Sequence, residues 1–449
     1  MSDYLSYEMI ALLMFSSMMM SMLTGQRVFA TIGFVGVVAA AVLWGNGGFE
    51  MGFSAGMKLM KWYPLLTLPL FIYMGYMLSE SGIAEDLYKA FHVWFGGMPG
   101  GLAVGTIGLM VVISAMNGLS VAGMAIGASI ALPELLRRGY DKIMVSGVIQ
   151  AGSSLGILIP PSVVLVLYGM IARQPVSQLW LAGVFPGLML ATMFCLYIII
   201  RCRLNPALGP ALPKEERDMP MVEKLKLLRA GILPFLIFFL MMGLFLMGIT
   251  SLVESSAVGA LGALFAAWYK GRLSKAVWNR VLEQTLGISC MFMWIILAAL
   301  CFGAVFDGLG AVRAIETLLV RDIGLTPWQI LIIMQLSFLV MGAFLDDTAM
   351  LVIVAPLYIP LVGKLDLGID NALIWYGVLY TITCQIAYMT PPFGYNLFLM
   401  KAMAPPDIRL IDIYRSVIPF VLIMMLGMVI IMIFPQIATW LPSQIYLRG

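Results

Sequence analysis

GSSLGILIPPS (152–162) constrains the fold most strongly, because it places two adjacent prolines inside an apolar run (143–172) that is long enough to be one membrane helix. Proline has no amide hydrogen and clashes with the preceding turn, so Pro160-Pro161 must unwind that helix. A second interruption of this kind, YMTPPFGYN (388–396), lies within the apolar run 372–400. Unpaired backbone at membrane depth is tolerated only where protein covers it or where it lines a hydrated cavity. The two breaks therefore predict a polar site inside a membrane.

The composition of the chain suits a lipid environment. Of its 449 residues, 62% are hydrophobic and only 11% are charged, about half the charged share of an ordinary soluble domain. Apolar runs of about 20 residues, long enough to span hydrocarbon as helices, recur from end to end. We predict an all-α polytopic membrane protein with about ten crossing helices, at residues 9–26, 28–45, 64–82, 143–172, 178–200, 230–249, 252–269, 286–306, 372–400 and 416–438.

Two longer apolar stretches carry polar residues near their middles. Residues 100–136 contain SAMNGLS (114–120), and residues 327–362 contain FLDDT (344–348). Each stretch is typical of a re-entrant hairpin, which enters and leaves the membrane on the same side. The first would open to the cytoplasm and the second to the periplasm.

The order of hairpin and interrupted crossing occurs twice. The segments 1–200 and 230–449 each contain one hairpin followed by one Pro-Pro break, and a basic, proline-rich linker (201–229) joins them. This pattern predicts an inverted repeat, in which substrate and ion sites lie at mid-membrane between discontinuous helices. Most of the 26 Lys and Arg residues then fall on the side of the linker. By the positive-inside rule that side is cytoplasmic, and both termini are periplasmic.

Three amphipathic segments carry Lys, Trp or Tyr among apolar residues, at 51–63, 83–95 and 274–284. We expect them to lie along the membrane interface as arm helices that brace the moving parts. The alternative is that they are the ends of tilted helices.

The polar tips and breaks supply the candidate site chemistry. Freed carbonyls beside hydroxyl groups suit a hard cation such as sodium. Asn117 and Ser120 at the first tip, at a half-helix start, suit a carboxylate substrate. Asp346 and Asp347 at the second tip need a counter-charge, for which a bound cation is a natural choice; Asp346 could instead cap the returning helix. Glu254 could carry protons, bind ions or cap a helix, and the cap is favoured.

The remaining polar groups at these places extend the candidate substrate site. The full set of candidate substrate residues is Asn117, Ser120, Ser154, Ser162, Asp347, Thr348, Tyr395 and Asn396. The five cysteines are scattered, so they indicate neither a disulfide framework nor a metal cluster. Nothing in the sequence points to an organic cofactor or to a nucleic acid partner.

At these residues the chain resembles the large membrane subunit of the tripartite ATP-independent periplasmic (TRAP) transporters, the DctM-like family. The resemblance runs nearly full length and is most specific at the two Pro-Pro breaks. It rests on MNGLSVAGMAIGASIALPELLRRGYDK (116–142), GSSLGILIPPS (152–162), GAFLDDTAMLVIVAPL (342–357) and TPPFGYNLF (390–398).

The resemblance implies an elevator-type carrier in the bacterial inner membrane, driven by a sodium gradient. It also implies a periplasmic binding protein (DctP-like) that delivers an organic acid, a small four-helix membrane subunit (DctQ-like) and surrounding membrane lipid. The family's cation sites, transferred by motif and formed largely by backbone carbonyls, fall at Ser114, Asn117, Gly156, Ile159, Gly342, Asp346, Ala387, Thr390 and Phe393.

Other functions stay open at this point. A stand-alone sodium and divalent-anion symporter shares the hairpin plan, but such carriers usually place Ser-Asn-Thr at both tips, and this chain does not. An intramembrane enzyme would need a constellation such as His-Glu-x-x-His, which is absent from the sequence. A passive channel is disfavoured because closed hairpins within a repeat suggest alternating access.

Overall fold

The computed structural model describes residues 6–24, 26–45, 47–118, 120–212, 220–317, 324–342, 347–391 and 394–446. Within these ranges the secondary structure is helical, and no β-strand occurs. The chain forms two compact units, each assembled from segments that are far apart in the sequence.

The first unit comprises residues 1–65, 287–341 and 345–373. Its helices α18 and α19 are neighbours, since the hydroxyl groups of Ser337 and Tyr358 lie 2.5 Å apart. A close approach of α2 to α16 depends on Gly36, where a Cβ atom would lie 3.1 Å from the Cα of Phe302. The helices of this unit are α1 (Tyr7–Leu23), α2 (Val28–Ala39), η2 (Ala40–Trp44), α3 (Gly48–Met60), the C-terminal part of α16, α17 (Ala311–Glu316), α18 (Pro327–Gly342) and α19 (Asp347–Lys364).

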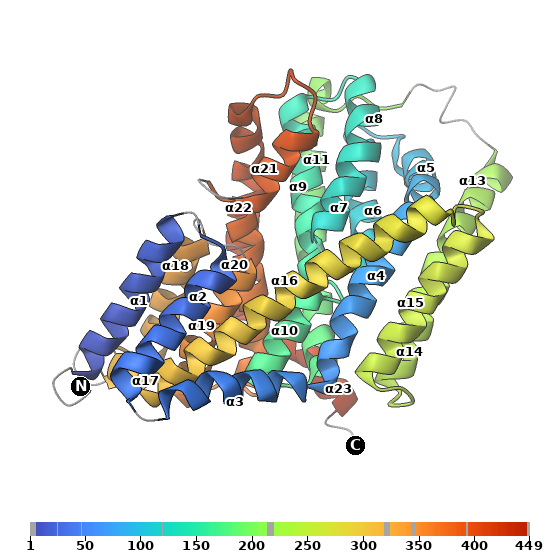
Figure 1. Cartoon of the computed structure of the whole chain (residues 1–449). Coiled ribbons are helices and arrows are strands. Elements are labelled where there is room, and N and C mark those ends of the chain that lie inside the picture. Colours follow the sequence, from blue (N-terminus) through green and yellow to red (C-terminus); the bar gives the residue numbers. More distant parts are fainter. Residues whose placement is uncertain are drawn as a thin grey trace. The chain divides into compact units, whose positions relative to one another are not determined.

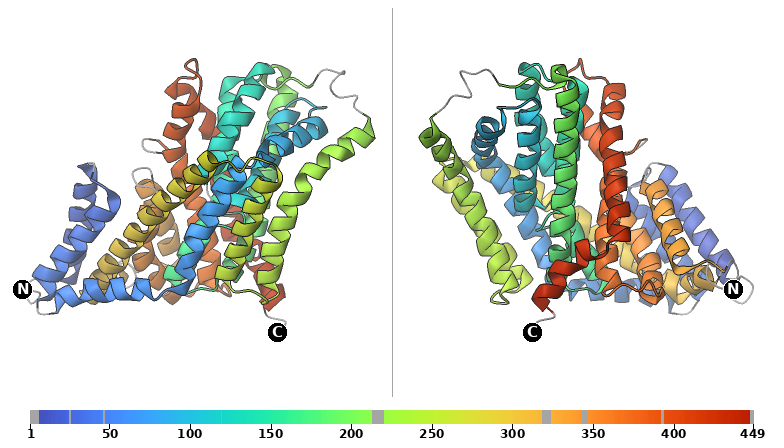
Figure 2. Two further views of the ribbon diagram at one scale, coloured as in Figure 1. Left: turned by 45° about the vertical axis from the view of Figure 1, so that its right-hand side comes forward. Right: turned by 180° about the vertical axis from the view of Figure 1, so that it is seen from behind.

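The second unit, which holds residues 66–286, 342–344 and 374–449, contains both Pro-Pro breaks. The long helices α9, α11 and α22 run beside one another in it (Figures 1 and 2). Its main helices are α4 (Thr67–Glu80), α5 (Ile83–Phe95), α6 (Gly101–Asn117), α7 (Ser120–Ile126), α8 (Leu132–Arg137), α9 (Lys142–Ser154), α10 (Val163–Ala172), α11 (Val176–Leu204), α13 (Met221–Leu227), α14 (Ile232–Leu246), α15 (Leu252–Tyr269), the start of α16 (Lys275–Gly308), α20 (Ala372–Tyr388), α21 (Tyr395–Met403), α22 (Leu410–Ile433) and α23 (Gln436–Tyr446).

An ion pair fastens the starts of α9 and α22. Lys142 Nζ lies 3.0 Å from Asp412 Oδ2, and the same carboxylate accepts a hydrogen bond from the backbone N–H of Arg409. Asp412 is 3% exposed. Deeper along α22, the ring of Phe420 meets the ring of Phe194 on α11 edge to face, at 5.5 Å between centroids. Helices from the two sequence halves therefore share one core.

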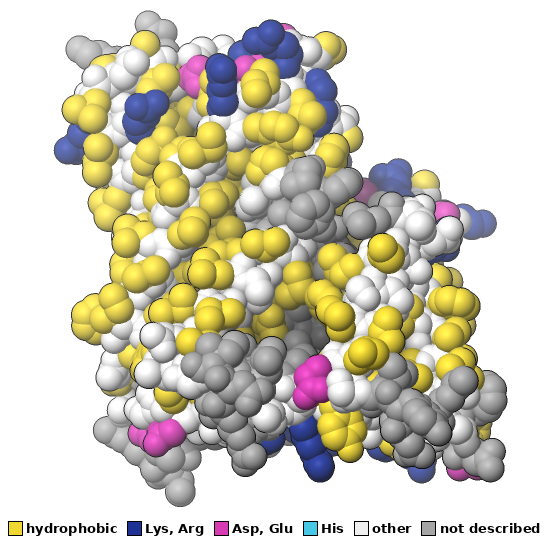
Figure 3. Space-filling view, turned by 90° about the vertical axis from the view of Figure 1, so that its left-hand side faces the viewer, with side chains coloured by type: hydrophobic (Ala, Val, Ile, Leu, Met, Phe, Trp, Pro, Cys, Tyr) yellow, Lys and Arg dark blue, Asp and Glu magenta, His cyan; other side chains and the backbone are white. Residues whose placement is uncertain are grey.

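The outer faces of the helices are apolar. In α22, Leu422 is 59% exposed while Phe420 is 1% exposed, so one face packs on protein and the other presents hydrocarbon. Figure 3 shows hydrophobic side chains spread over one face of the molecule, with Lys and Arg at its margins. In the described residues, five helical segments are long and apolar enough to cross a membrane. They are residues 176–204, 221–246, 252–269, 275–308 and 410–433. The chain is a multi-pass membrane protein.

Both interrupted crossings are present in the structure. The run 143–172 becomes α9 and α10, which are separated at the first break, and the run 372–400 becomes α20 and α21, separated at the second. The predicted unwinding at Pro160 and Pro391 is therefore confirmed. Each polar stretch within the longer apolar runs also separates two helices, α6 from α7 and α18 from α19.

One amphipathic segment differs from the expected arm helix. Residues 274–284 are the start of the 34-residue helix α16, which continues directly through the predicted crossing 286–306. No proline interrupts this stretch, so nothing ends the helix there. This segment is therefore the end of a longer helix and no separate arm helix, whereas 51–63 and 83–95 correspond to the separate helices α3 and α5.

Candidate functional site

The first polar tip is seated on the first break. Helix α6 ends at Asn117, and Gly118 turns the chain with φ of 64°. Its carbonyl accepts a hydrogen bond from the backbone N–H of Val163 at 3.3 Å. A Cβ atom at residue 118 would lie only 2.1 Å from the carbonyl oxygen of Pro161. Only glycine combines this left-handed backbone with so close an approach.

Two prolines leave carbonyl groups of the first break without their helical donors. Pro160 and Pro161 have no N–H, so they cannot donate to the carbonyls of Gly156 and Ile157 four residues earlier. The hydroxyl of Ser162 donates to the Ile157 carbonyl, and its oxygen accepts from the N–H of Leu165 at 3.1 Å. Among the described residues, no side chain donates in this way to the Gly156 carbonyl.

The second break is made of tight turns. The N–H of Thr390 donates to the Ala387 carbonyl at 3.2 Å, and the N–H of Gly394 donates to the Thr390 carbonyl at 3.1 Å. The Thr390 hydroxyl donates to the Ile386 carbonyl at 2.6 Å. A Cβ at Gly394 would lie 2.8 Å from the carbonyl oxygen of Tyr388. The carbonyl oxygens of Tyr388 and Thr390 thus both lie close to Gly394.

A buried polar cluster joins the two breaks to the first tip. Asn396, the second residue of α21, donates from Nδ2 to Ser120 Oγ at 3.3 Å and to Ser153 Oγ at 3.4 Å. All three side chains are at most 2% exposed. They come from α21, α7 and α9, so residues of both sequence halves form one cluster of hydroxyl and amide groups. It can offer hydrogen-bond donors and acceptors but no charge.

The described candidates occupy different parts of this arrangement. Ser120 and Asn396 belong to the cluster, and Ser154 is buried on α9 with its hydroxyl donating to the Ala151 carbonyl at 2.8 Å. Ser162 caps α10. Tyr395 is 44% exposed and lies beside Tyr388, 6.3 Å between ring centroids.

The candidate cation residues divide in the same way. Ser114 is buried one turn before the first tip, and its carbonyl accepts from Gly118 N–H. Gly156, Ile159, Ala387 and Thr390 lie at the breaks. Asp346 and Phe393 lie outside the described residues, and Gly342 is the last residue of α18. For Asn117, Asp347 and Thr348 the structure describes the helical backbone alone. The roles of all these residues stay predictions.

Sequence reasoning overlooked two buried residues of this region, Ser153 and Gln385. Ser153 sits beside Ser154 in the Gly-rich motif and faces Asn396. Gln385 is fully buried and donates from Nε2 to the backbone carbonyl of Ser154 at 3.0 Å. The sequence signal for Gln385 is a glutamine within an apolar helix.

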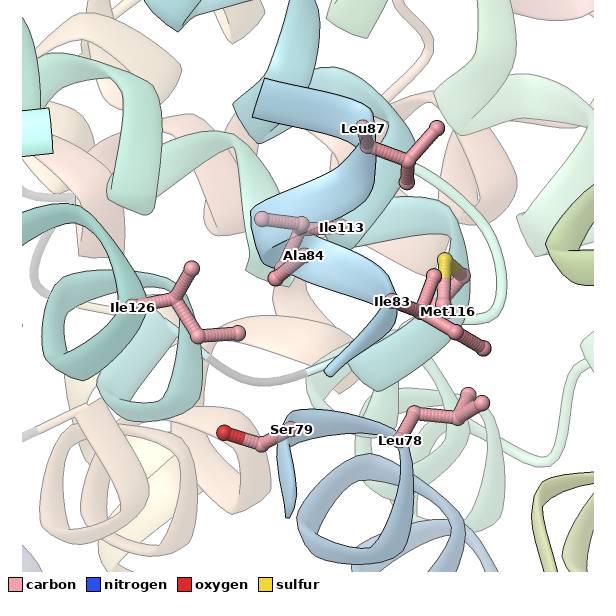
Figure 4. A pocket seen from close by; sticks show the side chains of 8 residues that line it. All are labelled: Leu78, Ser79, Ile83, Ala84, Leu87, Ile113, Met116 and Ile126. Atoms are coloured by element: carbon pink, nitrogen blue, oxygen red, sulfur yellow. The ribbon is translucent and has the colours of Figure 1, made fainter. Parts of the chain in front are cut away.

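A small cavity of about 10 Å³ lies nearby, where α4, α5, α6 and α7 meet (Figure 4). Ser79 is the single polar side chain among those that line it, and the others are aliphatic or thioether groups. An apolar lining offers no counter-charge and few hydrogen bonds, so it suits neither a cation nor a carboxylate. The lining residues are Leu78, Ser79, Ile83, Ala84, Leu87, Ile113, Met116 and Ile126.

The arrangement of helices is similar to that of a solved membrane transporter. The YdaH transporter of Alcanivorax borkumensis superimposes with a TM-score of 0.61 over 90% of this chain and 96% of that chain, at 14% sequence identity. At that identity the likeness concerns the fold alone. Together with the apolar outer faces, it defines the protein as a multi-pass helical membrane protein.

Relatives at higher identity give the family. The large permease protein DctM of a C4-dicarboxylate TRAP transporter from Pseudomonas aeruginosa is 30% identical over 384 residues, which cover 85% of this chain and 86% of that protein. A protein of the same description from Vibrio cholerae is 31% identical over 406 residues, with the same coverage.

The family model for the DctM component of the tripartite ATP-independent periplasmic transporters matches residues 7–437. The chain therefore belongs to this family and is a TRAP transporter large permease. It is a transport protein and not an enzyme, so the enzyme alternative falls away.

Proposed function

We propose that this permease imports an organic acid, taken from a periplasmic binding protein, and that an inward sodium gradient drives the import. It works beside a small membrane subunit in the bacterial inner membrane. Two re-entrant hairpins and two interrupted helices, arranged as an inverted repeat, carry the substrate across by an elevator movement. Both termini lie in the periplasm.

The observation that carries this proposal is the buried cluster of Ser120, Ser153 and Asn396 at the first break. Neutral hydroxyl and amide groups at 3.3–3.4 Å from one another form a small hydrogen-bonding surface in a core that is otherwise apolar. Polar groups are costly to bury and are retained where they bind something. An organic carboxylate fits because it accepts hydrogen bonds from such donors.

The relatives support the same class of substrate. Those from Pseudomonas aeruginosa and Vibrio cholerae are named for C4-dicarboxylates. A dicarboxylate carries two negative charges, and the neutral cluster cannot balance them. A cation bound at the breaks would supply the opposite charge.

Main-chain oxygens at the breaks support sodium as that cation. The carbonyls of Gly156 and Ile159 in the first break, and of Ala387 and Thr390 in the second, are hard oxygen ligands of the kind used at unwound helices. Asp346 would add a carboxylate at the second tip. Coupling arises because the cations and the acid bind at neighbouring positions.

The test is uptake into proteoliposomes that contain this permease with its small subunit, driven by an inward sodium gradient. The probe is the labelled acid that the cognate binding protein holds most tightly, chosen from a panel that includes C4-dicarboxylates. Each component is then omitted in turn. We expect uptake only when the binding protein, the small subunit and sodium are all present.

Omission also separates this function from that of a stand-alone symporter. Uptake that needs sodium but continues without the binding protein would identify a symporter that works alone. Uptake that needs neither would contradict the proposal as a whole.

A further inference from the structure

Two residues at corresponding positions before the two breaks are hydrogen-bonded to one another. Ser154 lies six residues before Pro160, and Gln385 lies six residues before Pro391. Gln385 Nε2 donates to the Ser154 carbonyl oxygen at 3.0 Å, and both side chains are fully buried. Where two repeats are related by a two-fold axis, matching positions can meet only at that axis. Under the proposed inverted repeat, the contact therefore lies at the symmetry axis between the two breaks.

The acceptor of this hydrogen bond is the carbonyl at which α9 ends and the 3-10 turn η5 (Leu155–Ile157) begins, just before the first break. In a continuing α-helix the N–H of Leu158 would donate to the Ser154 carbonyl. Here the N–H of Leu158 donates instead to the Leu155 carbonyl at 3.1 Å. The amide of Gln385 reaches across from α20 to the Ser154 carbonyl, and so it helps to hold the end of α9 in its unwound form.

Packing does not explain why this residue is a glutamine. Its Oε1 is buried and has no hydrogen-bond partner among the described residues. An unpaired buried acceptor is destabilising, whereas a methionine of similar volume carries no such atom. Apolar packing alone therefore does not require a glutamine at this position. What distinguishes it from a methionine is the hydrogen bond from its Nε2 to the Ser154 carbonyl.

We propose that Gln385 is a positioning residue that couples the two breaks, so that a cation bound at one favours binding at the other. Ala387 and Thr390, in the second break, follow Gln385 within the next two turns of the chain, and Gly156 follows Ser154 by two residues. A cation that holds the end of α20 in one conformation also holds the amide of Gln385 in place. Through its hydrogen bond to Ser154, that amide then fixes the position of the carbonyls in the first break. The inference rests on the proposed sodium coupling.

Gln150 offers a matched control on the same helix as Ser154. It is also fully buried, and its Oε1 likewise has no partner among the described residues. Its amide donates to the Ser146 carbonyl at 3.1 Å and to Ser416 Oγ at 3.2 Å, on α9 and α22. Gln150 therefore has the same chemistry and burial, but its contacts do not join the breaks.

The experiment compares Gln385→Met and Gln150→Met in the reconstituted complex. Sodium is titrated in uptake assays, and also against the melting temperature of the purified permease, which reports binding without transport. For the unmodified protein we expect a Hill coefficient for sodium above 1. In Gln385→Met it should fall to about 1, with half-saturating sodium raised on the order of fivefold or more. Gln150→Met should keep the unmodified values.

A second variant covers the case in which Gln385→Met does not fold. Gln385→Asn keeps the amide but is one methylene shorter, so it loses the reach to Ser154, and we expect the same loss of steepness. If the unmodified permease shows no response to sodium, the proposed sodium coupling fails and this inference fails with it. If it responds with a Hill coefficient of about 1, or if the two methionine variants behave alike, the coupling role of Gln385 alone is overturned.

Discussion

At the scale of single residues, Gly118 connects the first tip to the first break. Two independent features require glycine at this position: the positive φ and the close approach to the Pro161 carbonyl oxygen. The first costs a residue other than glycine about 1–2 kcal/mol. The second adds a steric clash in the middle of the site.

Gly118→Ala should therefore abolish uptake and lower the melting temperature more than a positive φ alone explains. Gly248→Ala is the matched control, because Gly248 has φ of 71° but a Cβ atom there would meet nothing within 4 Å. Thermal unfolding in detergent and uptake in proteoliposomes measure both variants. Equal losses of stability and uptake in the two variants would show that the contact with Pro161 is unimportant.

Some residue roles could be predicted from the sequence and others could not. The prolines dictate a break wherever they fall in a helix, so the positions of both breaks follow from local chemistry. Ser162 is a candidate substrate residue from the sequence, and the structure shows that its hydroxyl caps α10 and donates to the Ile157 carbonyl; its role toward substrate stays a prediction. The contacts Gln385–Ser154 and Asn396–Ser120 join residues more than 200 positions apart. No local pattern encodes such pairs.

At the scale of elements, α15 shows how a helix start defines a boundary. Ser251 Oγ accepts from the N–H of Glu254 at 3.3 Å, and Glu254 Oε2 accepts from the N–H of Ser251 at 2.7 Å. This capping box starts the helix at Leu252, where the sequence predicts a crossing from 252 to 269. The expected cap at Glu254 is confirmed.

If Glu254 serves only as a helix cap, transport does not need its negative charge. The stability of the helix, however, depends on its hydrogen bond from the N–H of Ser251. Glu254→Gln keeps a side chain that can complete a capping box, so uptake and its dependence on sodium should remain unchanged. Glu254→Ala should lower the melting temperature of the purified permease, because the backbone N–H of Ser251 loses its acceptor. A changed sodium or proton dependence in Glu254→Gln would assign the carboxylate to ion transport instead.

Helix α16 shows that the pattern of side chains does not always predict where a helix begins and ends. Its first ten residues (275–284) are amphipathic and the rest are apolar, a pattern that predicts two elements. Backbone hydrogen bonding continues through the change in polarity because no proline intervenes. A change in the pattern of side chains indicates a new environment, and it does not by itself end a helix.

At the scale of the whole molecule, the membrane class follows directly from composition, since a chain with 11% charged residues cannot cover itself with polar groups. The family follows from the motifs at the breaks and is shown by relatives of about 30% identity. Substrate specificity does not follow in this way. It depends on a few side chains in a cluster such as that of Ser120, Ser153 and Asn396, whose assembly requires the folded chain.

The central claim is that sodium supplies the energy for transport through this site. The most direct test is the accumulation ratio of the labelled acid in proteoliposomes with permease, small subunit and binding protein, under an imposed sodium gradient, an imposed proton gradient, or neither. We predict accumulation above equilibrium under the sodium gradient alone, rising as that gradient is steepened. Accumulation under the proton gradient at equal sodium on both sides, or none under the sodium gradient, would contradict this account.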